Sequence, residues 1–184
     1  MKELLIENII NENIYLISDT HFFHDKIGIY CDRPDNWQKF TFENWNDIIS
    51  DKDIVLHLGD LALGNKFEMT NILKELKGQK FLIKGNHDRY SGKWIEKFGF
   101  HLIKGNIEVR IDEKLWLFSH RAIYNNSNEP FINIHGHQHN KVPFITKWND
   151  RIYVNCSVEV IGYKPIKLSY ILERLEKLDV GIEI

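Results

Sequence analysis

The chain has 184 residues, of which 43% are hydrophobic and 27% charged, and its formal net charge is −2. This composition is that of a soluble globular protein with a full hydrophobic core, and we expect one domain over residues 1–184. Lysine and arginine are scattered without a basic run, which argues against extended nucleic-acid binding.

Membrane attachment and secretion are not expected either. No run reaches the roughly 18 apolar residues of a membrane span. The first residues, which include Glu3 and Glu7, do not resemble a signal peptide. The two cysteines, Cys31 and Cys156, are expected to be unpaired, so we expect a cytoplasmic protein.

Apolar patterns predict the secondary structure outside the motifs in chain order. Residues 4–9 and 14–18 predict a hairpin or two neighbouring strands, because a polar turn at 11–13 separates them. Helical spacing predicts helices at residues 41–49, 66–76 and 93–98. Further strands are predicted at 151–155, 158–161 and 165–168, followed by a helix that begins at Ser169 as N-cap and ends near residue 178.

Five strand-like apolar runs stop at residues that bind metals. These runs cover residues 14–18, 53–59, 80–85, 114–119 and 131–136. The residues that follow them are Asp19 and His21, Asp60, Asn86 and His87, His120, and His137 and His139. Open α/β sheets place their ligands beyond the carboxyl ends of their strands, so we expect these side chains to share one site.

The donor set indicates a catalytic metal site. Imidazole, carboxylate and amide donors without cysteine suit divalent first-row metals, whereas structural zinc sites are rich in thiolate. Gly59, Gly85 and Gly136 each precede a donor residue, and glycine lets the chain turn sharply and other groups approach closely. Aspartate or asparagine alone after a strand indicates only a turn. No turn requires the five histidines as well.

In their order and spacing these residues resemble the calcineurin-like metallophosphoesterases. The family signature runs D-x-H, G-D, G-N-H-D/E, a lone H and G-H-x-H. Here it reads Asp19-Thr20-His21, Gly59-Asp60, Gly85-Asn86-His87-Asp88, His120 and Gly136-His137-Gln138-His139. The resemblance covers residues 14–157 and implies an α/β fold, a four-layer α/β/β/α sandwich of two mixed β-sheets flanked by helices.

The resemblance also implies two divalent cations, Mn²⁺ in the first place and otherwise Fe, Ni, Co or Zn. The implied ligands are Asp19, His21 and His139 for one cation, Asn86, His120 and His137 for the other, and Asp60 as the bridge between them. Two cations about 3.5–4 Å apart repel each other, which agrees with a shared anionic ligand. A hydroxide bridging the cations is implied to attack phosphorus in line with the departing oxygen.

The same resemblance implies that His87 is the general acid that protonates the departing oxygen. Asp88 follows directly, and we expect its carboxylate to orient the His87 imidazole and to raise its pKa. Because an alkoxide leaving group benefits from a proton, a retained His87 favours a phosphodiesterase. A phosphomonoesterase of the same family, acting on a nucleotide or a protein, is the alternative.

Residues 22–36 are interpreted as a loop beyond the first strand, where His24 and Arg33 could face the substrate. Small phosphoesterases similar to this chain carry such an H-F-x-H and R-P pattern, and an arginine fork matches phosphate oxygens. The alternative is an ordinary solvated loop. Residues 89–93 and 121–130 are the other loops from which we expect substrate choice to come.

Three further histidines lie outside the motifs. His57 and His135 each precede a donor residue by two or three positions, so each is either a donor that orients a ligand or a packed core residue. His101 is interpreted as structural or surface.

We expect a dinuclear-metal phosphoester hydrolase whose partner is a small phosphoester such as a nucleotide. A non-catalytic protein-binding scaffold on the same fold is disfavoured because every motif position is filled. Metal-dependent hydrolysis of lactams or thioesters is disfavoured because an H-x-H-x-D-H run is missing: Asn140 and Lys141 follow His139.

Overall fold

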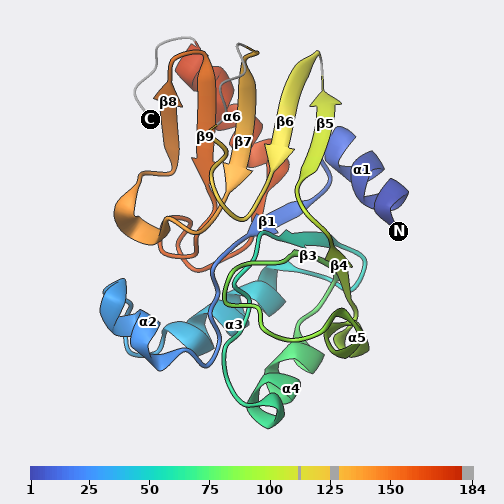
Figure 1. The fold of residues 1–184 in the computed structure, drawn as a ribbon, viewed down its shortest axis with the longest axis vertical. Coiled ribbons are helices and arrows are strands. Elements are labelled where there is room, and N and C mark those ends of the chain that lie inside the picture. The colour runs from blue at the N-terminus through green and yellow to red at the C-terminus, as the bar shows by residue number, and fades with distance from the viewer. Residues whose placement is uncertain (112, 125–128, 180–184) are drawn as a thin grey trace.

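A computed structural model describes residues 1–111, 113–124 and 129–179 (Figure 1). The helices are α1 (Lys2–Ile10), α2 (Asp25–Tyr30), α3 (Trp37–Ile48), α4 (Lys66–Glu75), α5 (Gly92–Ile95) and α6 (Leu168–Asp179), with 3-10 turns η1 (Glu96–Phe98) and η2 (His139–Lys141). The strands are β1 (Tyr15–Ile17), β2 (Ile54–His57), β3 (Gln79–Ile83), β4 (Phe100–Ile103), β5 (Ile107–Ile111), β6 (Lys114–Phe118), β7 (Phe131–His135), β8 (Ile145–Trp148), β9 (Arg151–Asn155) and β10 (Ile166–Lys167).

The strands form two mixed sheets, as predicted. Sheet one has the order β10-β1-β2-β3-β4, in which β10 is antiparallel to β1 and the others are parallel. Sheet two has the order β5-β6-β7-β9-β8, with β6, β7 and β9 parallel and the two edge strands antiparallel. Every residue of β2 and β7 is buried, as expected for strands covered on both faces.

Helices flank both sheets. Figure 1 shows α6 behind β7 and β9 of sheet two, while α3, α4 and α5 lie in the lower half with sheet one. One hydrophobic cluster includes residues from α1, both sheets and α6, such as Leu5, Leu56, Ile134 and Ile171. The two mixed sheets and their flanking helices confirm the fold class expected from the sequence.

The two sheets are joined where their central strands end. Ser18, just after β1, forms a parallel bridge with Ser157, just after β9. The Ser18 amide donates to the Cys156 carbonyl at 2.9 Å, and the Val158 amide donates to the Ser18 carbonyl at 3.1 Å. The carboxyl ends of β1 and β9 therefore lie side by side, which brings the motifs of both sheets to one place.

Several predictions of local structure were wrong. Residues 4–9 are part of helix α1, not a strand, and Leu5 and Ile9, one helical turn apart, are both fully buried. A short apolar run does not by itself distinguish a strand from a buried helix. Residues 158–161 form turns, and Ser169 lies inside α6 instead of capping it.

The remaining predictions agree with the structure more closely. The helices predicted at 66–76 and 93–98 correspond to α4 and to α5 with η1, and the helix predicted at 41–49 begins earlier, at Trp37. The residues that the structure describes include no helix with the length and apolarity that a bilayer crossing requires.

Candidate metal centre

All seven predicted metal ligands lie at the junction of the two sheets. Each follows the carboxyl end of a strand, as the sequence predicts: β1, β2 and β3 of sheet one, and β6 and β7 of sheet two. Six of the seven gather into two clusters, and within each cluster the donor atoms lie within 4.8 Å of one another.

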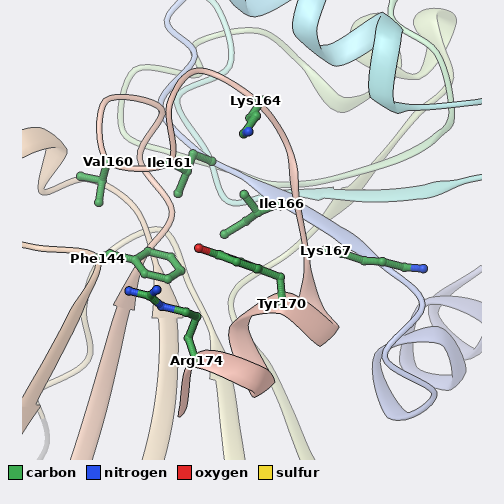
Figure 2. Close-up of a pocket in the computed structure, with 8 residues that line it drawn as sticks. All are labelled: Phe144, Val160, Ile161, Lys164, Ile166, Lys167, Tyr170 and Arg174. Atoms are coloured by element: carbon green, nitrogen blue, oxygen red, sulfur yellow. The ribbon is translucent and has the colours of Figure 1, made fainter. Parts of the chain in front are cut away.

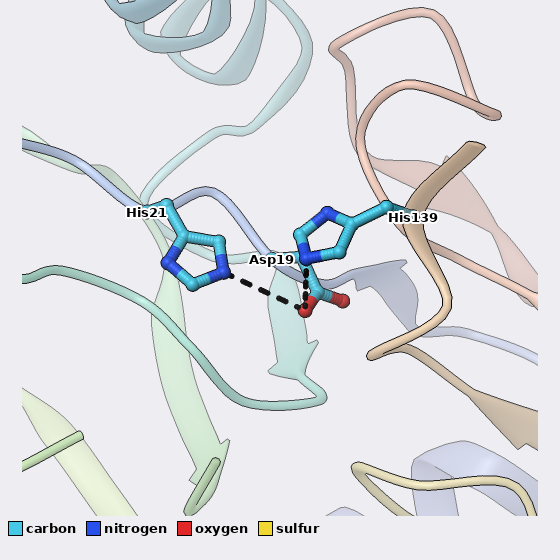
Figure 3. Close-up of side chains that lie close together, drawn as sticks. All are labelled: Asp19, His21 and His139. Atoms are coloured by element: carbon cyan, nitrogen blue, oxygen red, sulfur yellow. Dashed lines mark ion pairs between the residues drawn. The ribbon is translucent and has the colours of Figure 1, made fainter. Parts of the chain in front are cut away.

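The first cluster consists of Asp19, His21 and His139. Both histidine Nε2 atoms face the same carboxylate oxygen, Asp19 Oδ1, at 3.9 Å from His21 and 3.8 Å from His139 (Figure 3). His21 and His139 come from different sheets, so the cluster depends on their junction. Asp19 and His21 are almost completely buried.

The second cluster consists of Asp60, His120 and His137. The His120 and His137 rings have centroids 5.0 Å apart. Asn86 lies beside this cluster, with its Oδ1 3.0 Å from His120 Nε2. The sequence prediction had grouped Asn86 with the same two histidines, and the structure brings the three together.

Asp60 belongs to the second cluster and also reaches the first. Its Oδ2 is 3.5 Å from His21 Nε2, a member of the first cluster, and 3.4 Å from His120 Nε2, a member of the second. Its Oδ1 accepts a hydrogen bond from the His87 amide at 2.7 Å. This position is the one expected of a carboxylate shared by two cations.

The backbone is strained at these side chains. Left-handed φ angles, which are uncommon for residues other than glycine, occur at Asp19 (57°), His21 (48°), Asp60 (57°), His137 (70°) and His139 (50°). Such strain persists only where the surrounding structure enforces it, and it is concentrated at functional sites.

Two glycines make room for the carboxylates. A Cβ at Gly85 would overlap Asp60, and a Cβ at Gly136 would overlap Ser18 and Asp19. The loops of the junction can therefore approach one another only because these positions have no side chain, as expected from the sequence.

Three buried polar atoms in the first cluster have no hydrogen-bond partner among the described residues: Asp19 Oδ1 and both ring nitrogens of His21. Burying polar atoms without partners costs free energy, so native structures rarely leave them unsatisfied. A cation bound between Asp19 Oδ1 and His21 would satisfy one atom of each. The donor set therefore fits a divalent metal.

The electrostatics agree with this fit. Burial lowers the pKa of His21 to about 2 and that of His137 to about 4, so both are neutral near pH 7, the form that binds a metal. Burial acts to raise the pKa of Asp60, but hydrogen bonding to His120 and the His120 charge outweigh it and hold that pKa below its usual range. Asp60 is therefore a carboxylate.

His24 and His87 lie over the first cluster without belonging to either one. Their ring centroids are 5.3 Å and 5.2 Å from that of His21, and 5.6 Å from each other. Both side chains are partly exposed. They are thus placed where a molecule approaching the cluster from solvent would meet two imidazoles.

Asp88 does not have its predicted contact. Its carboxylate accepts hydrogen bonds from the amides of Asp60, Leu61 and Gly85 at 2.8–2.9 Å and from the Tyr90 hydroxyl at 2.7 Å. These donors belong to the loops after β2 and β3, and none is the His87 imidazole. Asp88 therefore holds together the loops that carry Asp60 and Asn86, and the prediction that it orients His87 is corrected.

Arg33 does not face the substrate side. Residues 25–30 form helix α2 instead of a continuous loop, and the Arg33 side chain after it is fully buried. Its guanidinium bonds Glu159 and the carbonyls of Asp19 and Thr20. Arg33 therefore contacts groups in the protein interior, and the prediction that it contacts the phosphate of a substrate is corrected.

Sequence reasoning missed Glu159 and Ser157. Glu159 Oε1 is 2.9 Å from His139 Nδ1, and Ser157 Oγ donates to Asp19 Oδ2 at 3.1 Å. Although burial acts to lower the pKa of His139, its bonds to Cys31 and Glu159 raise that pKa to about 10. Ser157 lies at the end of residues 14–157, where the resemblance seen in the sequence stops, and Glu159 lies in residues 158–161, which were predicted as a strand. Neither residue belongs to a motif.

His57 and His135 are buried and hydrogen-bonded. His57 Nδ1 accepts from the Gly59 amide at 3.1 Å, and its Nε2 lies 3.0 Å from Thr20 Oγ1. His135 Nδ1 lies 2.8 Å from the Gly136 carbonyl. His101 is partly exposed and packs near Phe81. His57 thus touches the residues next to three ligands, whereas His101 is structural, as interpreted from the sequence.

A surface hollow of about 420 Å³ lies apart from the metal centre (Figure 2). The described residues that line it are Phe144, Val160, Ile161, Lys164, Ile166, Lys167, Tyr170 and Arg174. None of these residues carries an imidazole, a carboxylate or a thiol. This lining cannot hold a divalent metal, so the chemistry belongs to the junction of the sheets.

Comparison with known proteins assigns the family. The model of the calcineurin-like phosphoesterases matches residues 12–176. The uncharacterized protein MJ1445 of Methanocaldococcus jannaschii is 40% identical over 174 residues, or 89% of this chain and 92% of that protein. The crystal structure of AQ665, a protein of unknown function from Aquifex aeolicus, aligns with a TM-score of 0.66 and 26% identity over 87% of this chain and 97% of that one. The chain therefore belongs to the calcineurin-like phosphoesterase family and is a metal-dependent phosphoester hydrolase.

Proposed function

We propose that this hydrolase uses two divalent cations to cleave small phosphodiesters. The observation that carries the proposal is the position of Asp60, whose Oδ2 faces His21 of the first cluster at 3.5 Å and His120 of the second at 3.4 Å. One carboxylate placed between two sets of imidazole and oxygen donors supports a pair of cations with a shared ligand.

Asp19, His21 and His139 would hold one cation, and Asn86, His120 and His137 the other, with Asp60 contributing to both. Oxygen and imidazole donors without thiolate suit Mn²⁺ best, and also Fe, Ni, Co or Zn. When bound, such cations lower the pKa of a water and polarise the phosphoryl oxygens.

His87 is the proposed general acid. Its amide is anchored to Asp60 Oδ1 at 2.7 Å, which fixes the backbone while the partly exposed ring lies near His21. From this position the imidazole can give a proton to the departing alkoxide oxygen. A diester with an alkoxide leaving group needs this proton more than a substrate with a better leaving group does.

His24 is the proposed second contact to the substrate. Its ring lies 5.6 Å from that of His87, and the side chain is partly exposed. An imidazole N–H on the accessible side of the ring could bond a phosphoryl oxygen. His24 thereby keeps the substrate-side role expected from the sequence, which Arg33 loses.

A phosphomonoesterase is the second candidate because of Arg121. This exposed arginine donates to Asn86 Oδ1 at 3.2 Å and so adds a positive charge beside the second cluster. A monoester carries one more negative charge than a diester and would gain from it. Residues 125–128 of the loop 121–130, from which substrate choice was expected, lie outside the described residues.

Nucleotides and other small phosphoesters remain the proposed substrates, and the cytoplasm the proposed compartment. The cysteines Cys31 and Cys156 are free and buried, which suits a reducing environment.

The proposal is tested with the full chain, stripped of metal and reloaded with Mn²⁺. Initial rates are measured on a chromogenic phosphodiester, a chromogenic phosphomonoester and a chromogenic lactam. We expect hydrolysis of the diester to be fastest and to need metal. A higher kcat/KM for the monoester would replace the proposal by the second candidate, and hydrolysis of none would favour a non-catalytic scaffold.

A further inference from the structure

A buried ion pair lies behind the first cluster. Arg33 Nε and Nη2 both donate to Glu159 Oε1, the former at 2.8 Å, and the two side chains are 0% and 4% exposed. The partners are 126 positions apart in the sequence. Removing two charges from water carries a desolvation penalty that can exceed their mutual attraction, so stability alone does not explain a buried pair.

The other donors of Arg33 hold the backbone at Asp19. Nη2 donates to the Asp19 carbonyl at 2.7 Å and Nη1 to the Thr20 carbonyl at 3.1 Å. The Trp37 ring, 4.4 Å from the guanidinium carbon, covers one face of the fork. Asp19 has a left-handed φ of 57°, so Arg33 stabilises a strained segment in the conformation that presents the Asp19 carboxylate.

The acceptor of the pair holds His139. Glu159 Oε1 lies 2.9 Å from His139 Nδ1. When Nδ1–H donates to this carboxylate, the lone pair is on Nε2, which points at Asp19 Oδ1 at 3.8 Å. A carboxylate in this position fixes both the tautomer and the ring orientation of a metal-binding histidine.

We propose that Arg33 and Glu159 are positioning residues that together set the geometry of the first cluster. Arg33 fixes Asp19 through the main chain, Glu159 fixes His139 through Nδ1, and the ion pair couples the two. This inference rests on the proposed function, because it assumes that the first cluster holds a cation. It gives Arg33 a role on the metal side of the site in place of the predicted phosphate contact.

A third metal site is a weaker interpretation of the same residues. Cys31, His139 and Glu159 have donor atoms within 4.8 Å of one another. The guanidinium of Arg33, however, already bonds Glu159 Oε1, and its charge would repel a metal cation bound at this carboxylate. The charge of Glu159 is therefore used by Arg33 and His139.

The test measures metal affinity at each cluster for Arg33→Met, Arg33→Lys, Glu159→Met and Glu159→Gln. Glu159→Gln keeps an acceptor for His139 and removes the charge, so it preserves packing if the other variants fold poorly. Arg110→Met is the matched control, because it breaks an exposed ion pair, between Arg110 of β5 and Glu129, that includes no motif residue. Mn²⁺ content and binding isotherms are recorded with the full chain, along with the melting temperature.

We expect the wild type and Arg110→Met to bind two ions. In Glu159→Met and Arg33→Met the affinity of one ion falls by about 10–100-fold while the other is unchanged, and Glu159→Gln and Arg33→Lys fall between. A lower melting temperature with both affinities unchanged would overturn the positioning role and leave a purely structural pair. Failure of the wild type to bind any ion would instead overturn the proposed function.

Discussion

The two clusters share the carboxylate between them, but they are built differently. In the first cluster, Asp19 and His21 are buried, and Asp19 and His139 are bonded from behind by Arg33, Ser157 and Glu159. In the second, Asp60 and His120 are also buried, and His137 is partly exposed as His139 is in the first, but Asn86 is exposed. The described contacts of Asn86 Oδ1 are to His120 and to the exposed Arg121.

This difference indicates a division of work. A cluster whose ligands are bonded from behind keeps its ion and sets the position of the other groups, while a cluster with an exposed ligand can exchange its ion and admit a substrate. Rigid supporting contacts are what hold a site to its productive geometry. The following predictions either break this division or sharpen it.

The largest effect is expected from Asp60→Asn, because it removes the charge that both clusters use. The substitution keeps the size of the side chain but leaves two cations without a shared anion. We expect less than one ion per chain, and a rate loss of about 10³-fold or more, since metal ions contribute several kcal/mol to transition-state stabilisation.

Metal content after dialysis and initial rates on the chromogenic diester measure this effect. Asp35→Asn, which changes an exposed aspartate, is the control and should bind two ions. Two ions in Asp60→Asn would show that the clusters do not depend on each other through this residue.

His87→Asn should affect the chemistry without affecting either cluster. Asparagine keeps the backbone amide that donates to Asp60 Oδ1, so both ions should stay bound. Loss of a general acid lowers kcat by about 10²–10⁴-fold, and the loss should be smaller on a diester with an acidic leaving group than on one with an alkyl alcohol. Loss of an ion in this variant would contradict the role given to His87.

Metal removal should separate the clusters directly. Because Asn86, a proposed ligand of the second cation, is exposed, we expect a chelator to remove that ion first, at least about tenfold faster than the other, as burial slows access. A time course of Mn²⁺ release should then show two phases of equal amplitude. His137→Ala should retain the slow phase alone, and a fast phase in that variant would show that burial does not set the order of release.

The sequence was enough to predict the clusters but not what supports them. Asp19, Asp60 and His120 could be predicted because each ends a legible apolar run, and parallel strands bring such ends to one edge. Glu159 could not, since its role depends on Arg33, 126 positions away, and on contacts that no local pattern encodes. Asp88 was noticed because it adjoins His87, yet its carboxylate turns the other way, to the amides of the neighbouring loops.

Errors in secondary structure have a similar origin. Helix α1 was missed because residues 4–9 are too short and too apolar for periodicity to separate a strand from a buried helix. Helix α2 has only one buried residue, Ile27, and so shows little amphipathic pattern. Both helices owe their conformation to tertiary contacts, which the sequence pattern does not show.

The smallest effect is expected from the protonation of His57 at low pH. The His57 ring contacts Thr20, the residue between Asp19 and His21 of the first cluster. Burial lowers the pKa of His57 to about 3 from the ordinary 6.5, and Nδ1 must stay unprotonated to accept from the Gly59 amide. Between these values the unfolded chain binds more protons than the folded one, so this stability is fully present above pH 6.5 and is lost as the pH falls toward 3.

His57→Asn removes the titrating group while placing Oδ1 where Nδ1 accepts. The free energy of unfolding of the metal-stripped protein is measured with urea at pH 7 and at pH 4.5. Between these two pH values it should fall by about 1–3 kcal/mol more in the wild type than in His57→Asn. His57 Nε2 lies 3.0 Å from the Oγ1 of Thr20, the residue between Asp19 and His21 in the chain. Protonation of His57 should therefore weaken metal binding at the first cluster before it weakens binding at the second. If the free energy of unfolding falls equally in the two proteins, the pKa of His57 is the same in the folded and unfolded chains. The first cluster is then supported by Arg33, Ser157 and Glu159 alone.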